Sequence, residues 1–172
     1  MAKVITFSRV FPSYHPRAGE PTYFVEKIIN SLGLPEYKRM TAHDLYSEDV
    51  KTTQADFLKG SCNPLFNHLP KYHTIRAGHR WKVGDMFSPR VWSGKPYRSK
   101  QIQFAPDIEI KKVWDVEFDG DGCFWIFSDK ERGANILYTV AKNDGLSLTD
   151  MMSWFNKPFT GQIIAWNENI NY

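Results

Sequence analysis

The sequence predicts an α+β fold, in which several strands build a small, partly closed β-barrel and one or two helices flank it. The chain has 172 residues, which suits one well-packed domain and is short for two. Hydrophobic residues make up 42% of the chain and aromatic residues 15%, which is enough material for a core. Beyond residue 71, short alternating segments follow one another and are separated by turns that contain Gly, Pro or Asn. We therefore expect a single domain over residues 1–172.

The N-terminal third begins with a predicted strand over residues 5–11, which Pro12 interrupts. A helix is predicted over residues 22–32, because its apolar side chains fall on one helical stripe and the Gly33 and Pro35 that follow would end it. The stripe consists of Phe24, Val25, Ile28, Ile29 and Leu32.

The remaining two thirds are predicted to be mostly β-structure. Strands are expected within residues 81–92, 99–104, 108–118, 123–127 and 160–166. A short helix is expected after the turn at residues 143–145, where Ser147 and Asp150 have the spacing of a capping box. The buried face of that helix would carry Leu148, Met151, Met152 and Phe155.

The charge is unevenly distributed along the chain. The net charge is only +3, but residues 71–113 carry ten Lys or Arg and three Asp or Glu. Trp81, Phe87, Trp92 and Tyr97 are interleaved with these basic residues, and such a mixture favours a nucleotide, RNA or single-stranded nucleic acid through charge and base stacking. The alternative is a solvated hairpin with ordinary Lys and Arg side chains.

Several other classes of function lack their sequence signals. No apolar run approaches the roughly 20 residues that span a bilayer, and the first residues lack a signal-peptide pattern, so we expect a cytoplasmic protein without a membrane partner. Cys62 and Cys123 are too few and too isolated to predict a disulfide. A zinc site on His68, His73 and His79 is conceivable, but their spacing matches no zinc motif, so we expect neither a metal nor another cofactor.

The segment KYHTIR at residues 71–76 is the strongest candidate for a functional site. If it is a strand, Thr74 and Arg76 share one face, since side chains alternate along a strand. Lys71 is an odd number of residues from Thr74, so it must lie in the loop after Pro70 or beside a bulge to reach the same side. A threonine hydroxyl becomes a nucleophile only when a nearby base removes its proton, and a lysine can serve if its pKa is lowered.

The order of these segments resembles the ASCH domains of the PUA-like superfamily. The resemblance rests on the first strand, KYHTIR at residues 71–76, WKVGD at 81–85, the basic hairpin, the turn at 143–145 and GQII at 161–164. It is good over residues 71–166 and weak over residues 3–11. It implies a PUA-like barrel, with residues 12–70 as a large insertion relative to minimal members.

One branch of this family removes the acetyl group from acetylated cytidine. By resemblance, Thr74 would be the nucleophile and Lys71 its base, and Asp144 would stand where that branch has a glutamate. Arg76 would anchor the substrate, while Trp81, Trp92, Tyr97 and Arg98 would complete the binding site. Such an amidohydrolase would act on a nucleoside or nucleotide.

Two alternatives stay open. Other PUA-like domains bind RNA or a modified base without catalysis, and RNA cleavage is also attributed to the family. On the residues alone, the favoured interpretation is a cross-strand ion pair between Lys71 and Asp144, with Thr74 as an ordinary strand residue, and only the resemblance brings the hydrolase level with it.

Overall fold

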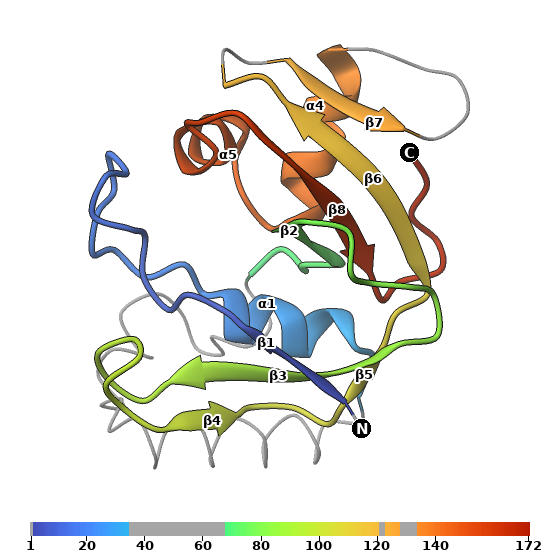
Figure 1. The fold of residues 1–172 in the computed structure, drawn as a ribbon. Coiled ribbons are helices and arrows are strands. Elements are labelled where there is room, and N and C mark those ends of the chain that lie inside the picture. Colours follow the sequence, from blue (N-terminus) through green and yellow to red (C-terminus); the bar gives the residue numbers. More distant parts are fainter. Residues whose placement is uncertain (1, 35–67, 121–122, 128–133) are drawn as a thin grey trace.

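The computed structural model describes residues 2–34, 68–120, 123–127 and 134–172. These residues form eight strands and three helices (Figure 1). The strands are β1 Lys3–Thr6, β2 His73–Ala77, β3 Met86–Trp92, β4 Gln101–Gln103, β5 Ile108–Glu109, β6 Lys112–Phe118, β7 Phe124–Phe127 and β8 Phe159–Ala165. The helices are α1 Phe24–Ser31, α4 Ala134–Asn143 and α5 Leu148–Trp154. Most of the predicted 12–70 insertion, residues 35–67, lies outside the described residues.

The described strands belong to two sheets, which confirms the α+β class. In the first sheet β3 pairs with β1 in parallel and with β4 and β5 in antiparallel orientation. The second sheet is antiparallel in the order β2-β8-β6-β7, so β8 is flanked on both sides. No strand pairing joins the two sheets in the described part of the chain, and a closed barrel is therefore not observed there.

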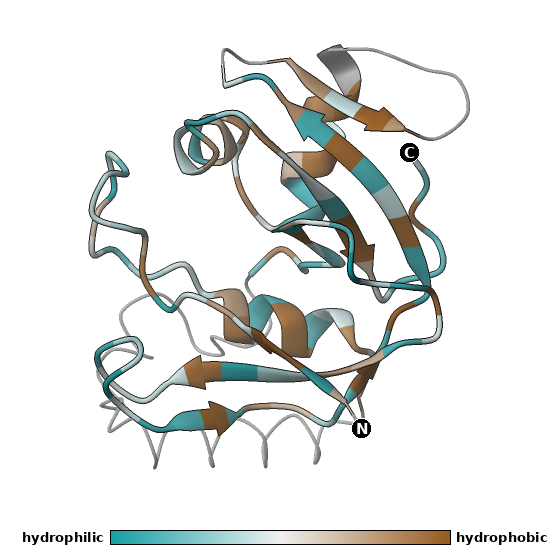
Figure 2. Ribbon diagram, in the orientation of Figure 1, coloured by the Kyte–Doolittle hydropathy of each residue, from teal (hydrophilic) through white to brown (hydrophobic). Residues whose placement is uncertain are grey.

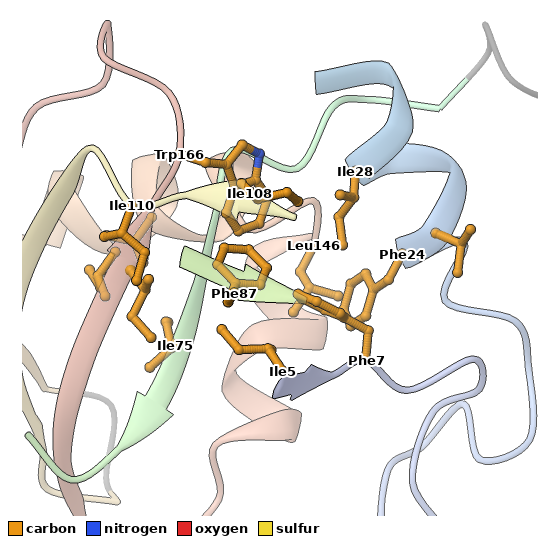
Figure 3. Close-up of a cluster of buried hydrophobic side chains, with 14 of the residues drawn as sticks. Ile5, Phe7, Phe24, Ile28, Ile75, Phe87, Ile108, Ile110, Leu146 and Trp166 are labelled. Carbon is orange, nitrogen blue, oxygen red and sulfur yellow. The ribbon is translucent and has the colours of Figure 1, made fainter. Parts of the chain in front are cut away.

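One hydrophobic core connects the two sheets and α1. Figure 3 shows Phe87 of β3 in a cluster with Ile5 of β1, Ile75 of β2 and Ile28 of α1. Phe87 and Ile28 are completely buried. Figure 2 shows teal and brown residues alternating along β6, the pattern of a strand with one face toward a core. The contacts of this shared core hold β2 of the second sheet beside β1 of the first.

Several predicted elements have different boundaries in the structure. The helix predicted over residues 22–32 is confirmed as α1. The strand predicted over 5–11 is wrong beyond Thr6, because the chain continues as a loop after the backbone N–H of Phe7 has bonded to the carbonyl of Arg90 in β3. The single strand predicted over 108–118 is also wrong. It divides into β5 and β6, because Ile110 bonds to Asp85 beside the first sheet while Lys111 bonds to β8 of the second.

Helix α4 was not predicted from the sequence. Its apolar residues Ile136, Leu137, Val140 and Ala141 have the spacing of one helical face, which is the signal that could have revealed it. The helix matters for the site because Asp144 follows its last residue.

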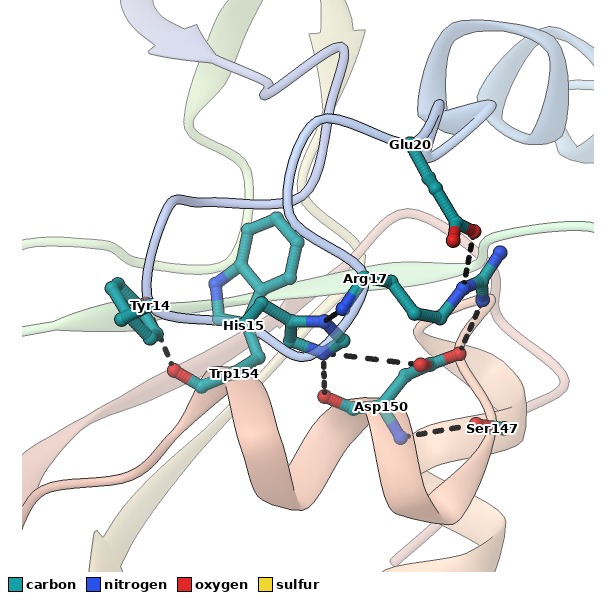
Figure 4. Close-up of polar contacts among 7 residues, drawn as sticks. All are labelled: Tyr14, His15, Arg17, Glu20, Ser147, Asp150 and Trp154. Atoms are coloured by element: carbon teal, nitrogen blue, oxygen red, sulfur yellow. Dashed lines mark hydrogen bonds and ion pairs between the residues drawn. The ribbon is translucent and has the colours of Figure 1, made fainter.

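The loop between β1 and α1 is fastened to α5 (Figure 4). Tyr14 donates a hydrogen bond to the carbonyl of Trp154 at 3.0 Å, and Arg17 pairs with Asp150 at 2.9 Å. The backbone N–H of Arg17 donates to Nδ1 of His15, so the His15 proton resides on Nε2, which donates to the carbonyl of Asp150 at 3.1 Å. These contacts fix the loop over the helix.

Of the two hydrogen bonds of the capping box predicted at the start of α5, only the one to the Ser147 side chain is observed. The hydroxyl of Ser147 accepts a hydrogen bond from the backbone N–H of Asp150 at 3.0 Å, as an N-cap should. The carboxylate of Asp150 pairs instead with Arg17 of the loop. Within the described residues, no helix combines the length and the apolar composition needed to cross a bilayer.

Replacement of Gly161 by alanine is expected to destabilise the fold strongly. A Cβ at this position of β8 would lie 2.1 Å from the carbonyl oxygen of Arg76 and 2.9 Å from Cα of Ala77, both backbone atoms of β2. We expect Gly161→Ala to lower the free energy of unfolding by about 2 kcal/mol or more, measured by urea denaturation. Gly94→Ala is the matched control, because its Cβ would make only an ordinary 3.5 Å contact with Ser99. Equal unfolding midpoints for the two variants would contradict this packing.

Candidate active site: a buried lysine–aspartate pair at a small cavity

A cavity of about 220 Å³ lies between the end of β1, the start of α1, β2 and the end of α5. Its charged and hydroxyl-bearing lining includes Lys71, Thr74, Arg76 and Asp144. Its other lining residues are Thr6, Phe7, Ser8, Phe24, Ile75, Trp92, Pro96, Tyr97, Trp154 and Phe155. The cavity thus gathers residues from both sheets and from α1 and α5.

Lys71 is held just before β2, outside the strand, as the odd spacing to Thr74 predicted. Its backbone N–H donates to the carbonyl of Lys27 in α1 at 3.0 Å. Gly145 packs against it so closely that a Cβ there would lie 3.3 Å from Cβ of Lys71, and Gly145 also has a φ of +73°. A side chain at position 145 would therefore be strained and would crowd the lysine.

The amine of Lys71 is buried and has three neighbours. Only 1% of the residue is exposed. Its Nζ lies 2.6 Å from Oδ1 of Asp144, donates to the carbonyl of Asp144 at 2.8 Å, and sits 4.3 Å from the centre of the Phe24 ring. These contacts stabilise the ammonium form, since carboxylate, carbonyl and aromatic face all attract a cation.

Burial changes the acid–base properties of the pair. It lowers the pKa of Lys71 from 10.5 to about 8, although the charge of Asp144 and its hydrogen bond oppose that shift. The charges of Arg76 and Lys27 act in the same direction as burial and contribute to this value. Burial likewise raises the pKa of Asp144, while Lys71 is the strongest influence in the other direction. The lysine therefore begins to lose its proton at a pH close to neutral, well below the pH at which an ordinary lysine does.

Asp144 lies in the short connection between α4 and α5, where its backbone N–H donates to the carbonyl of Val140. The charges of Lys71, Arg76 and Lys27 stabilise its ionised form.

Thr74 and Arg76 are alternate residues of β2, and both line the cavity. Thr74 is 4% exposed and lies opposite Ile164 of β8. Arg76 donates from Nη2 to the carbonyl of Thr6 at 2.9 Å, and its guanidinium lies 5.2 Å from the centre of the Phe7 ring. Burial lowers the pKa of Arg76 to about 10, so the guanidinium remains charged at neutral pH.

The aromatic residues divide into two groups. Trp92 and Tyr97 line the cavity with their ring centres 5.3 Å apart, and Tyr97 is 90% exposed. Trp81, which the sequence assigned to the binding site, is 2% exposed and packs in the core against Phe87, because the side chain of Gln162 on β8 bonds to both the backbone N–H and the carbonyl of Trp81. Arg98 is exposed and does not line the cavity.

His73 and Tyr172 lie near the Lys71–Asp144 pair, and neither was predicted to belong to the active site. The side chain of Asn143 donates to the phenol oxygen of Tyr172 at 2.9 Å, and the same oxygen is hydrogen-bonded to Nδ1 of His73, 2.7 Å away. Nε2 of His73 lies 3.5 Å from Oδ1 of Asp144. Burial holds the pKa of His73 well below its usual value, so the ring is neutral.

A larger cavity of about 450 Å³ is lined in part by Lys27 and Gly145. Arg17, His68 and Lys142 also line it, but Arg17 is neutralised by Glu20 and Asp150. Among the described residues that line it there is no buried pair like Lys71 and Asp144, so the smaller cavity is the better candidate for chemistry. In the described residues no group of three or more His, Cys, Asp or Glu side chains could hold a metal ion.

Comparisons of the chain with protein-family models, curated proteins and solved structures give no match.

Proposed function

We propose that the protein is an amidohydrolase of the ASCH type that removes an acyl group from a modified pyrimidine nucleoside such as acetylated cytidine. One observation carries the proposal. A completely buried lysine with a pKa near 8 lines the same small cavity as a threonine hydroxyl and a carboxylate. Such a group can act as a base near neutral pH, whereas an ordinary surface lysine cannot.

In the proposed reaction, neutral Lys71 accepts the hydroxyl proton of Thr74 while Oγ1 attacks the acyl carbonyl carbon. The ammonium that Lys71 becomes in this step stabilises the negative charge that develops on the carbonyl oxygen, while Arg76 anchors the substrate. The tetrahedral intermediate collapses as Lys71 returns the proton to the leaving amine, which leaves the acyl group on Thr74. Water then hydrolyses this ester with Lys71 again as the base, and the carboxylic acid departs. Asp144 keeps the lysine amine in place throughout.

The rate of this reaction should increase with pH. Only the neutral form of Lys71 can accept a proton, and that form becomes predominant above a pKa of about 8. We expect kcat/KM for acetylated cytidine to increase from about pH 6 and to level off above about pH 9, with a midpoint near 8. Circular dichroism at each pH controls for unfolding. A profile that is flat or falls over this range would exclude Lys71 as the base.

A second candidate function is binding of RNA or a modified nucleotide without turnover. The observation that favours it is the loop at residues 93–100, which exposes Tyr97 next to Trp92 and carries Lys95, Arg98 and Lys100 at the surface. Base stacking and phosphate contacts would give affinity that falls steeply with salt. Neutralising Arg90, Lys95, Arg98 and Lys100 together should then weaken binding of a single-stranded RNA, and unchanged binding would refute this function.

A further inference from the structure

The cavity is lined by two cationic side chains and one carboxylate, so it carries one positive charge in excess when all three are ionised. Its charged lining residues are Lys71, Arg76 and Asp144. Asp144 pairs directly with Lys71 at 2.6 Å, and no described carboxylate is paired with Arg76. Asp144 also stabilises the charge of Arg76, so it is shared between two cations, and the further charges that act on these groups are again cations, Lys27 on Asp144 and Arg80 on Arg76.

Arg76 also has one hydrogen-bond donor, Nε, that has no acceptor among the described residues. Its Nη2 is bonded to the carbonyl of Thr6, and its ring-facing side packs on Phe7. Its Nε is buried, yet it donates to no acceptor among the described residues. A buried donor without an acceptor is costly, and a partly buried charge that shares its only nearby carboxylate among the described residues with a second cation adds to that cost. A ligand that supplied both would relieve both costs.

We propose that this cavity binds an oxyanion, the carboxylate or phosphate of a small ligand, at the guanidinium of Arg76. Two oxygens on one atom match the fork of a guanidinium, which makes such contacts shorter and stronger than those to a neutral carbonyl. This inference rests on the proposed function only in naming the substrate, which would be an anionic acylated compound such as the 5′-monophosphate of acetylated cytidine.

The spacing of the site is compatible with one ligand that reaches both groups. Thr74 and Arg76 are alternate residues of β2, so their Cα atoms lie roughly 7 Å apart along the strand. An amide near Lys71 and Thr74 and an anionic group near Arg76 can therefore belong to the same small molecule. The pyrimidine would contact Trp92 and Tyr97 at the cavity wall.

The test compares neutral and anionic probes on the whole protein. Calorimetry would measure the affinity of wild type for cytidine and for cytidine 5′-monophosphate. Inorganic phosphate and acetate, tested as competitors, separate a phosphate site from a carboxylate site. We expect the monophosphate to bind at least about tenfold more tightly than cytidine, or acetate to bind if the site takes carboxylates.

Three variants locate the anion. Arg76→Gln should abolish the preference for the anionic probe, while Arg76→Lys should retain part of it, because the charge remains without the fork. Arg80→Gln removes the same charge from an exposed neighbour outside the cavity lining and should retain the preference. Thermal unfolding of each variant shows whether it is folded. If Arg76→Gln does not fold, the comparison of probes on wild type and Arg76→Lys still decides.

Equal affinity for cytidine and its monophosphate, with no binding of phosphate or acetate, would overturn the inference. Its failure is distinguishable from failure of the hydrolase. Preferential binding of anionic probes without turnover of any acylated compound would refute the hydrolase alone. Turnover of acetylated cytidine with the same kcat/KM as its monophosphate would refute the anion site alone.

Discussion

Replacement of Thr74 by alanine is expected to lower kcat/KM for acetylated cytidine by a factor of about a thousand or more. The alanine lacks the hydroxyl that attacks the carbonyl, and loss of a nucleophile removes most of the catalytic effect of the groups that serve it. The side chain is 4% exposed and belongs to a paired strand, so a small reduction in stability is also expected. Steady-state kinetics at pH 8 would measure the loss, with urea denaturation to show that the variant is folded.

Thr74→Ser is the matched control for this prediction. Serine retains the hydroxyl and loses only a methyl group, so it should retain a measurable part of the activity. If Thr74→Ala hydrolysed the substrate at the rate of wild type, Thr74 would have no role in the chemistry. The cavity would then require another nucleophile.

Replacement of Asp144 by asparagine is expected to cause the largest loss of stability of any single change at the site. The substitution leaves the ammonium of Lys71, a residue that is 1% exposed, without its counter-charge. Breaking a buried pair in this way costs about 3–5 kcal/mol, and we expect a decrease of that order in the free energy of unfolding at pH 7. Urea denaturation monitored by Trp fluorescence would measure it.

The pH dependence of that loss provides a second check. The pKa of Lys71 in the folded protein, about 8, is below its ordinary value of 10.5, so the unfolded chain binds more protons between these values. The contribution of Lys71 to stability therefore becomes more favourable as pH rises through this window. Without Asp144 the lysine is neutral at a still lower pH, so the destabilisation should be smaller at pH 9 than at pH 7.

The double variant Lys71→Met, Asp144→Asn is the control for the interaction itself. Methionine fills similar space without a charge, so the double variant should be more stable than Asp144→Asn alone. The loss of stability in the double variant is compared with the sum of the losses in Lys71→Met alone and Asp144→Asn alone. If the two are equal, the 2.6 Å pair contributes no interaction energy of its own.

Parts of the site could be predicted from local pattern. The parity of strand positions placed Thr74 and Arg76 on one face and excluded Lys71 from the regular strand, and the structure has this arrangement. The apolar stripe of α1 predicted the helix whose Phe24 contacts the amine of Lys71. These features depend on neighbours within a few residues, and the sequence records them directly.

Other parts depend on contacts between distant segments. His73 and Tyr172 are 99 positions apart, and no local pattern indicates that the phenol would hold the imidazole. The division of the predicted strand at residues 108–118 likewise follows from pairing with β3 on one side and β8 on the other. Trp81 and Trp92 both lie in the basic, aromatic segment of the sequence and look alike there. Only the tertiary fold places Trp81 in the core and Trp92 at the cavity.

The measurement that tests the central claim most directly is the release of cytidine from acetylated cytidine by the wild-type protein, followed by chromatography at pH 8. Thr74→Ala at the same concentration serves as the control for contaminating activity. The proposal predicts many turnovers of cytidine per protein molecule with wild type and almost none with the variant. Absence of cytidine with wild type, or equal release by both proteins, would contradict the assignment of Lys71, Thr74 and Asp144 as a hydrolytic site for this substrate.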